Sequence, residues 1–384
     1  MKMPLSKNLF VAAILLLAVA SSAFSQATAP LKFKNSAMYA GIDIGSKGVK
    51  LSVLEIGKNA QKTGTFNVLQ ESSINTDFIS FSDPTFGATL SGLCKLYNTA
   101  LEEHKIPAER IFTVISSGVK SQAEKENKNS WVTKLIDSFK IKIQDPSRQV
   151  AVVDVMQEAR LSHLGIIPNT KRYTTFLIDI GSGNTKGGYF PNGNTNDLKL
   201  FQINWGTKSV ANATDKRVDE DKSADNFSRQ LNRVLAGEAN TEIVYAVNAS
   251  GAYNMSDNIA VSGGIAWSVA TLLHPEMIDN PVVPVTYNEV LKFTQELVKN
   301  HQSFSDVNII KNLAGSAEEK ATIAKEVKRV NTVFDQKSLM SGAGLLLKIM
   351  RQFEGIYDKK EFFLVKNGQV GWISAYVDQY ISKL

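Results

Sequence analysis

The sequence contains a single cysteine and only four histidines among its 384 residues. One cysteine cannot form an intramolecular disulfide, and Cys94 stands with Leu90, Leu93 and Tyr97 at helical spacing, which predicts a buried thiol on an apolar face. The histidines are scattered and match no zinc-ligand spacing. No serine lies in a nucleophile elbow. A disulfide scaffold, a zinc site and a serine or cysteine nucleophile are therefore not expected.

Long apolar runs are also missing. The run Leu9–Ala20 has 12 residues, which is short for a membrane-spanning helix. Lys2 and Lys7 precede it, and Ala23–Ser25 supplies small residues at the −3 and −1 positions of a cleavage site. This pattern is typical of a secretory signal peptide over residues 1–25, with an uncleaved anchor as the alternative. We therefore expect a soluble, exported protein, periplasmic or extracellular, with no membrane span after signal cleavage.

Composition places the chain among soluble globular proteins, with 43% hydrophobic and 21% charged residues. Its length is typical of two domains. The formal net charge is +6, and loss of Lys2 and Lys7 with the signal peptide lowers it by two. This mild positive excess suits an anionic ligand, and we expect no nucleic-acid duplex as partner.

One internal repeat organises the chain. The segment Ala40–Ser46 (A-G-I-D-I-G-S) recurs 136 residues later as Leu177–Ser182 (L-I-D-I-G-S). In both copies a lysine, Lys50 or Lys186, stands seven residues after the aspartate. Each copy is typical of a strand, a glycine-containing turn and a second strand. The repeat therefore predicts two lobes of similar topology that face each other.

Alternating strands and helices fill the remainder and predict an α/β architecture. We expect a first lobe over residues 26–170 and a second over 171–384, with a final helix that can pack back on the first lobe. Helices are expected at 86–104, 121–139, 154–164, 287–301, 316–329 and 342–353, strands at 66–74, 110–116 and 174–179, and a polar surface loop at 212–225.

The repeated D-x-G-S turn carries chemistry that a single copy would not establish. Glycine permits a tight turn and close approach of the backbone to a ligand. Successive backbone N–H groups in such turns form nests that bind anions, and an aspartate at the end of a strand can hold a metal ion or a water molecule. Two copies at corresponding positions, Asp43 and Asp179, favour a site over a structural turn.

The two copies resemble the first and second phosphate motifs of the actin, chaperone and sugar-kinase superfamily. Further segments, in the same order along the chain, resemble the exopolyphosphatase/guanosine-pentaphosphatase (Ppx/GppA) family of that superfamily. The segment Gln157–Leu161 (Q-E-A-R-L) with Gly165 is similar to its E-E-A-R-L-x-x-x-G signature. Looser matches are Val114–Lys120, Trp205–Val210, Ser262–Gly264 and Val365–Trp372.

This resemblance implies two actin-like (ribonuclease H-like) lobes with a central cleft. It implies Glu158 as the general base, with Asp43 and Asp179 as catalytic carboxylates that position water or Mg²⁺, a hard cation that suits carboxylate and phosphate oxygens. The implied phosphate-binding residues supply backbone, hydroxyl or ammonium donors: Gly45, Ser46, Lys47, Ser116, Ser117, Gly181, Ser182, Gly183, Asn184, Thr185, Lys186, Gly263 and Gly264.

Three basic residues depart from the family pattern. The second motif of the family usually runs D-I-G-G-G-S-T-E, but here its final carboxylate is Lys186. The usual asparagine of the first motif is Lys47, and the arginine of the T-S-A-V-R segment is Lys120. Lys186 reverses a charge that helps to organise metal and water in the family, so it bears on catalysis more than on ligand binding.

Three functional hypotheses follow. The first is an exported hydrolase that releases terminal phosphate from polyphosphate or from a guanosine polyphosphate, with Glu158 as base. The second is a phosphate- or polyphosphate-binding descendant without turnover, which Lys186 and Lys47 favour. The third is an ATP-using kinase or ATPase, which the export signal disfavours. A homodimer stays open, since the sequence does not give the oligomeric state.

Overall fold

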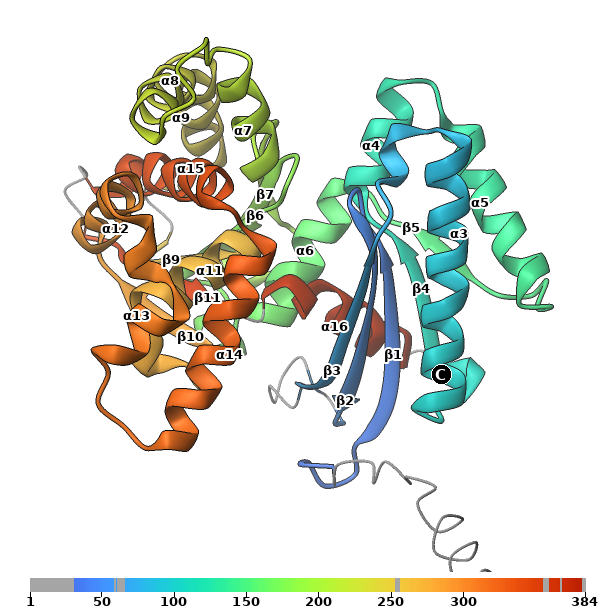
Figure 1. Cartoon of the computed structure of the whole chain (residues 1–384). Helices are drawn as coiled ribbons and strands as arrows, with labels where there is room; N and C mark the ends of the chain where they lie inside the picture. Colours follow the sequence, from blue (N-terminus) through green and yellow to red (C-terminus); the bar gives the residue numbers. More distant parts are fainter. Residues whose placement is uncertain are drawn as a thin grey trace, which may run out of the picture.

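The computed structural model of the chain describes residues 31–58, 60, 66–252, 256–354, 359–366 and 368–381. The predicted signal peptide lies outside the described residues. Figure 1 shows two bodies side by side, each built around its own β-sheet. The prediction of two α/β lobes is therefore confirmed. None of the described helices is long and apolar enough to cross a membrane.

The first sheet has five strands in the order β3-β2-β1-β4-β5. Strands β1, β2 and β3 form an antiparallel meander, and β4 and β5 extend it in parallel from β1. In the β1–β2 hairpin, Asp43 lies opposite Lys50. The bounds are β1 Ala37–Ile44, β2 Gly48–Ile56, β3 Phe66–Asn75, β4 Ile111–Ile115 and β5 Val150–Val152.

The second sheet repeats this arrangement and adds one strand. Its order is β10-β11-β9-β6-β7-β8, in which β8, β7 and β6 form the antiparallel meander and β9 and β11 the parallel extension. In the β6–β7 hairpin, Asp179 lies opposite Lys186. The bounds are β6 Thr175–Ile180, β7 Thr185–Tyr189, β8 Lys199–Ile203, β9 Asn258–Ser262, β10 Val282–Val285 and β11 Glu361–Val365.

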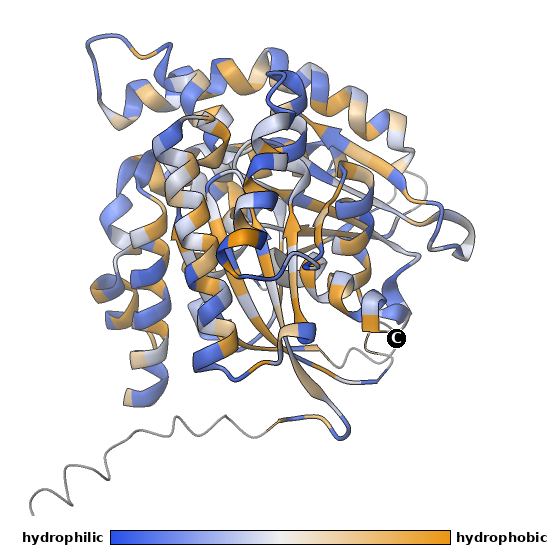
Figure 2. Ribbon diagram, turned by 90° about the vertical axis from the view of Figure 1, so that its right-hand side faces the viewer, coloured by the Kyte–Doolittle hydropathy of each residue, from blue (hydrophilic) through white to orange (hydrophobic). Residues whose placement is uncertain are grey.

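Each sheet carries its own helices, and the hydrophobic core of each lobe lies between them. In Figure 2 the interior strands are mostly hydrophobic and the outer helices carry hydrophilic stretches. The helices of the first lobe are α3 Asp83–Asn98, α4 Ser117–Lys125 and α5 Asn129–Lys142. Those of the second are α7 Thr207–Asp215, α8 Ala224–Ala236, α9 Glu238–Ser250, α11 Gly264–Leu273, α12 Tyr287–Lys299, α13 Asp306–Lys311, α14 Ala317–Val333 and α15 Gln336–Glu354.

Two further helices, α6 (Val155–Ile166) and α16 (Gly368–Ile381), lie between the lobes (Figure 1). They cross in direct contact, because a Cβ atom on Gly165 would collide with the backbone of Gly371. Helix α16 also packs on β1 and β2, and α6 packs on β7, so the pair joins the two sheets. The boundary between lobes near residue 170 stays a prediction.

Two local predictions are wrong. The helix expected at 121–139 is two helices, α4 and α5, separated by a turn in which Asn127 has a φ of 55°. Asparagine tolerates this left-handed conformation, which ends a helix. The polar segment 212–225 is not one loop, because α7 continues to Asp215 through the buried residues Val210 and Thr214. Most residues of this segment are polar, so its sequence did not indicate the narrow apolar face that α7 buries.

The predicted buried thiol is partly correct. Cys94 is half-buried and packs at the margin of the first core beside Leu93 and Tyr97. Burial raises the pKa of the Cys94 thiol, which disfavours the nucleophilic thiolate.

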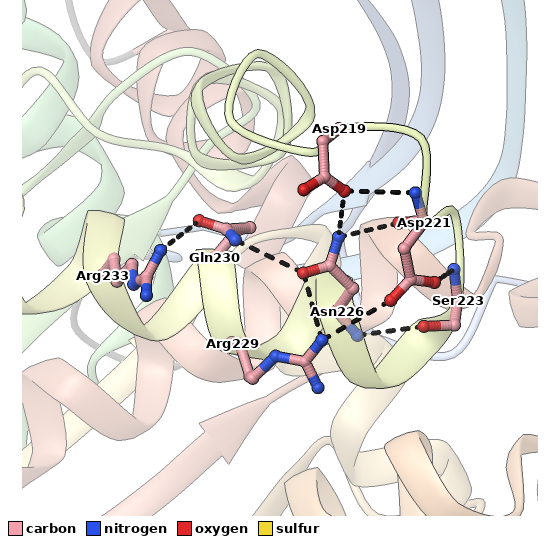
Figure 3. A network of polar contacts seen from close by, with 7 residues as sticks. All are labelled: Asp219, Asp221, Ser223, Asn226, Arg229, Gln230 and Arg233. Carbon is pink, nitrogen blue, oxygen red and sulfur yellow. Dashed lines mark hydrogen bonds and ion pairs between the residues drawn. The ribbon is translucent and has the colours of Figure 1, made fainter.

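A polar network fixes the start of α8 in the second lobe (Figure 3). The Ser223 hydroxyl accepts from the Asn226 backbone N–H at 3.2 Å, which is the arrangement of a helix N-cap. The Asn226 side-chain amide donates to Asp219 Oδ1 and to the Asp221 carbonyl at 3.1 and 2.7 Å. The network satisfies its members internally and ties the preceding loop to α8, so we assign it a structural role.

Candidate functional site

Two equivalent turns form the centre of the candidate site. In the first hairpin the Gly45 N–H donates to the Gly48 carbonyl at 2.9 Å, and in the second the Gly181 N–H donates to the Asn184 carbonyl at 3.0 Å. These turns follow β1 and β6, in which Asp43 and Asp179 are the penultimate residues. The sequence repeat therefore corresponds to a repeat in backbone geometry.

Glu158 lies at the N-terminus of α4. Its Oε2 accepts from the backbone N–H of Ser117 at 2.7 Å, where the preceding Ser116 makes no side-chain cap. A helix N-terminus stabilises negative charge because its first N–H groups have no partner within the helix. Glu158 is only 4% exposed, although it belongs to another helix, α6. Glu158 is thus the capping anion of α4.

Lys186 joins Glu158 to Asp179. Its Nζ lies 3.0 Å from Glu158 Oε1 and 3.4 Å from Asp179 Oδ2. The second oxygen of Asp179 accepts from the Ser262 hydroxyl at 2.9 Å. Lys186 is 6% exposed, so the cluster is nearly enclosed by protein. All four carboxylate oxygens of Glu158 and Asp179 therefore have a partner.

The charged groups of this cluster keep one another ionised. Burial raises the pKa of Glu158, but the Lys186 ammonium and the Ser117 hydrogen bond outweigh it, and the net pKa lies below the usual value. Burial would lower the pKa of Lys186, yet Glu158 and Asp179 raise it on balance. Glu158 is consequently anionic and Lys186 cationic, and protonation of Glu158 would break its ion pair with Lys186.

Asp43 is in a different state. Burial raises the pKa of Asp43 to about 7, and Glu158 and Asp179 add to the rise, although Lys50 and Lys186 oppose it. Its Oδ1 atom is buried without a hydrogen-bond partner. Asp43 is thus electrostatically coupled to the other three charges, but it forms no direct ion pair with any of the described residues. It is the carboxylate of the site that has spare hydrogen-bonding capacity.

A divalent metal ion does not fit the cluster as it stands. Glu158 and Asp179 already share a cation, the Lys186 ammonium, which would repel a second one. Over the described part of the chain, no group of three histidine, cysteine, aspartate or glutamate side chains is arranged to hold a metal. Metal ligation by Asp43 and Asp179 stays a prediction from sequence.

The segment Ser262–Gly264 packs against the end of β6, just before the second turn. Gly263 has a φ of 99°, and a Cβ atom there would collide with the Ile180 carbonyl and lie 3.2 Å from Asp179 Oδ1. Only glycine satisfies both conditions. The next residue, Gly264, begins α11.

The Thr185 hydroxyl, expected to contact phosphate, instead donates to the Trp205 carbonyl at 2.6 Å. Its phosphate contact is therefore not supported by the side-chain geometry.

The sequence reasoning missed Lys208. The Lys208 N–H donates to the Ser182 carbonyl at 2.8 Å, so α7 begins directly on the second turn. Contact with the Lys47 ammonium, from the other lobe, lowers the pKa of Lys208. Lys47 also pairs with Asp77 at 3.1 Å. The signal in the sequence was a lysine two residues after Gly206, inside the segment Trp205–Val210 that matches the family only loosely. Two like charges from opposite lobes are thereby held together beside the turns.

Comparison with solved structures identifies the fold. A Ppx/GppA family member from Aquifex aeolicus superposes with a TM-score of 0.60 at 16% identity, over 91% of this chain and 98% of that chain. The chain has the fold of the Ppx/GppA proteins. Two further solved structures have the same fold. An exopolyphosphatase from Cytophaga hutchinsonii superposes with a TM-score of 0.54 at 12% identity, over 91% of this chain and 99% of that chain. An exopolyphosphatase-like protein superposes with a TM-score of 0.60 at 13% identity, over 90% of this chain and 98% of that chain. The predicted actin-like fold class is thus confirmed.

Sequence alone gives no such match. No protein-family model matches the chain, and no curated protein is detectably similar to it. At these identities the structural likeness establishes the Ppx/GppA fold and leaves the chemistry to the residues of the site itself.

Proposed function

We propose that this chain binds phosphate-chain anions between its two lobes and does not use Glu158 as a general base. One observation carries the proposal. Both oxygens of Glu158 are engaged, one by the Lys186 ammonium and one by the Ser117 N–H, and its pKa is lowered. A general base works best with a pKa near the working pH and with a free oxygen facing water. Glu158 has neither.

Anion binding is supported by the surroundings of the cluster. The turns at 45–48 and 181–184 offer backbone N–H groups, and Lys47 and Lys208 approach from opposite lobes. Placing two ammonium groups together is unfavourable unless an anion, such as Asp77 or a ligand, lies beside them. A chain of phosphates or a phosphorylated nucleotide has the charge to relieve that repulsion. The solved exopolyphosphatases of this fold make polyphosphate the first ligand to test.

A phosphoanhydride hydrolase is the second candidate, and Asp43 favours it. Its pKa of about 7 and its unpaired Oδ1 are the properties of a general base. In this scheme water attacks the terminal phosphorus, Asp43 takes the water proton, and the bridging P–O bond breaks to release phosphate and a shortened chain. Magnesium, expected from the resemblance, belongs to this candidate, because Asp43 alone among the three carboxylates is not held by Lys186.

Calorimetric titration with tripolyphosphate, together with a phosphate-release assay, tests the proposal. Binding without release supports it. Absence of binding, or release that falls on Glu158→Gln substitution, overturns it. Release that survives Glu158→Gln but falls about 10²–10⁴-fold in Asp43→Asn selects the second candidate. Lys142→Ala, which removes an exposed charge on α5, is the matched control for nonspecific electrostatics.

We further propose that the protein acts outside the cytoplasm. The proposal depends on the basic start and apolar run before Ala23–Ser25. Amino-terminal sequencing of protein from the cell envelope should give a mature chain beginning near Gln26. Intact Met1 on soluble cytoplasmic protein contradicts it. Assembly as a homodimer stays open and is measured by light scattering of the mature chain.

A further inference from the structure

We infer that Lys186 is a tethered counter-cation that takes the place of a divalent metal ion between Glu158 and Asp179, so that the interlobe site works without one. This inference rests on the geometry of the cluster and stands independently of the proposed function.

The first argument is that every carboxylate oxygen of Glu158 and Asp179 already has a partner. Glu158 and Asp179 come from different elements, α6 and the end of β6, and converge on one point occupied by the Lys186 Nζ. Their remaining oxygens accept from the Ser117 N–H and the Ser262 hydroxyl. Proteins bind Mg²⁺ mainly through carboxylate oxygens, and here each of the four already has a partner. A metal ion would have to displace the ammonium to bind these residues.

The second argument is that the ammonium cannot easily leave. Lys186 lies on β7, directly opposite Asp179 in the hairpin register, with β8 on the other side of its strand. Helix α6 packs on β7, and Lys186 is 6% exposed. A lysine held by the buried Glu158 and the partly buried Asp179, and covered by a helix, has no solvated position to move to without separating α6 from β7. The cation is therefore built into the fold.

The third argument is the contrast with Lys50, the equivalent residue of the first hairpin. Lys50 lies opposite Asp43 in the same register, yet its side chain is exposed. A lysine at this position is thus not buried by the hairpin itself. Burial occurs only where α6 supplies a second carboxylate, which is what a cation site requires.

Binding of Mn²⁺, a spectroscopic substitute for Mg²⁺, tests the inference in the absence of phosphate. The loss of the free-ion electron paramagnetic resonance signal is measured for the wild type, for Lys186→Met and for the matched control Lys50→Met. We expect no stoichiometric binding to the wild type or to Lys50→Met. Lys186→Met exposes two carboxylates to the ion and should bind one Mn²⁺ at least tenfold more tightly.

Two outcomes overturn the inference: wild-type protein that binds Mn²⁺ as tightly as Lys186→Met, or folded Lys186→Met that binds none. If Lys186→Met does not fold, the wild type alone decides. Its melting temperature should be the same in MnCl₂ and in EDTA, and a metal-dependent rise refutes the tethered cation. Because no phosphate is present, failure of the proposed anion binding leaves this result unaffected.

Discussion

The β1–β2 and β6–β7 hairpins have the same antiparallel pairing and the same hydrogen bond across the turn. In each of them an aspartate lies opposite a lysine. They differ in what covers the lysine. Lys50 is exposed, and Asp43 keeps an unpaired oxygen, whereas Lys186 is enclosed by α6 and joins two carboxylates. The same local motif therefore gives a titratable acid in one lobe and a locked ion cluster in the other. The neighbouring helix makes the difference.

The largest expected effect comes from removing the buried lysine. Lys186→Met leaves Glu158 and Asp179 without their shared cation, and breaking a buried ion pair in this way typically costs about 3–5 kcal/mol of unfolding free energy. Lys50→Met, at the matched exposed position, should change it by less than about 0.5 kcal/mol. Urea unfolding followed by circular dichroism measures both. Equal effects would mean that the two hairpins are equivalent after all.

The second prediction concerns Ser52 and Gly188, which stand at matched positions two residues after Lys50 and Lys186. Gly188 in β7 has a φ of 150°, and a Cβ atom there would collide with the Lys199 carbonyl. Gly188→Ser, which copies Ser52 of the first hairpin, should therefore cost roughly 1–3 kcal/mol. The reverse change, Ser52→Gly, should cost only about 0.5–1 kcal/mol through backbone entropy. Thermal unfolding of both variants checks the asymmetry, and a stable Gly188→Ser protein contradicts it.

The third prediction concerns pH. The pKa of Asp43 is near 4 in the unfolded chain and about 7 in the fold, so between these values the folded state binds more protons. Its contribution to stability is complete below pH 4 and falls as pH rises to 7, by at most about 1.4 kcal/mol per pH unit. Asp43→Asn should remove this slope. Unfolding free energies from pH 4 to 8 for both proteins test it, and identical slopes refute it.

The smallest expected effect is on ligand affinity. Lys47 in the first turn corresponds to Gly183 in the second, so Lys47→Gly makes the turns alike and removes one exposed ammonium. One screened charge contributes up to about 1 kcal/mol, so tripolyphosphate affinity should fall roughly two- to fivefold. Titration at low and at high salt checks the electrostatic origin. An unchanged affinity would place the anion away from the first turn.

Much of the fold followed from the sequence. The D-I-G-S repeat predicted two lobes of like topology, and the apolar segments before each aspartate predicted β1 and β6. These features are local, because a tight turn requires glycine and a buried strand requires a continuous apolar run. The break between α4 and α5 escaped prediction, since Asn127 ends the helix by a backbone conformation that polar residues permit without demanding.

The sequence by itself identified the four charged side chains of the central cluster, Asp43, Asp179, Glu158 and Lys186, but not Lys208 beside them. Only the tertiary structure decided how they are paired. Glu158 is 28 residues from Lys186 in the chain and 41 from Ser117, yet it contacts both. Whether a carboxylate is a base or half of an ion pair depends on burial and on the charge beside it. Those quantities exist only after α6 has packed against β7 and α4.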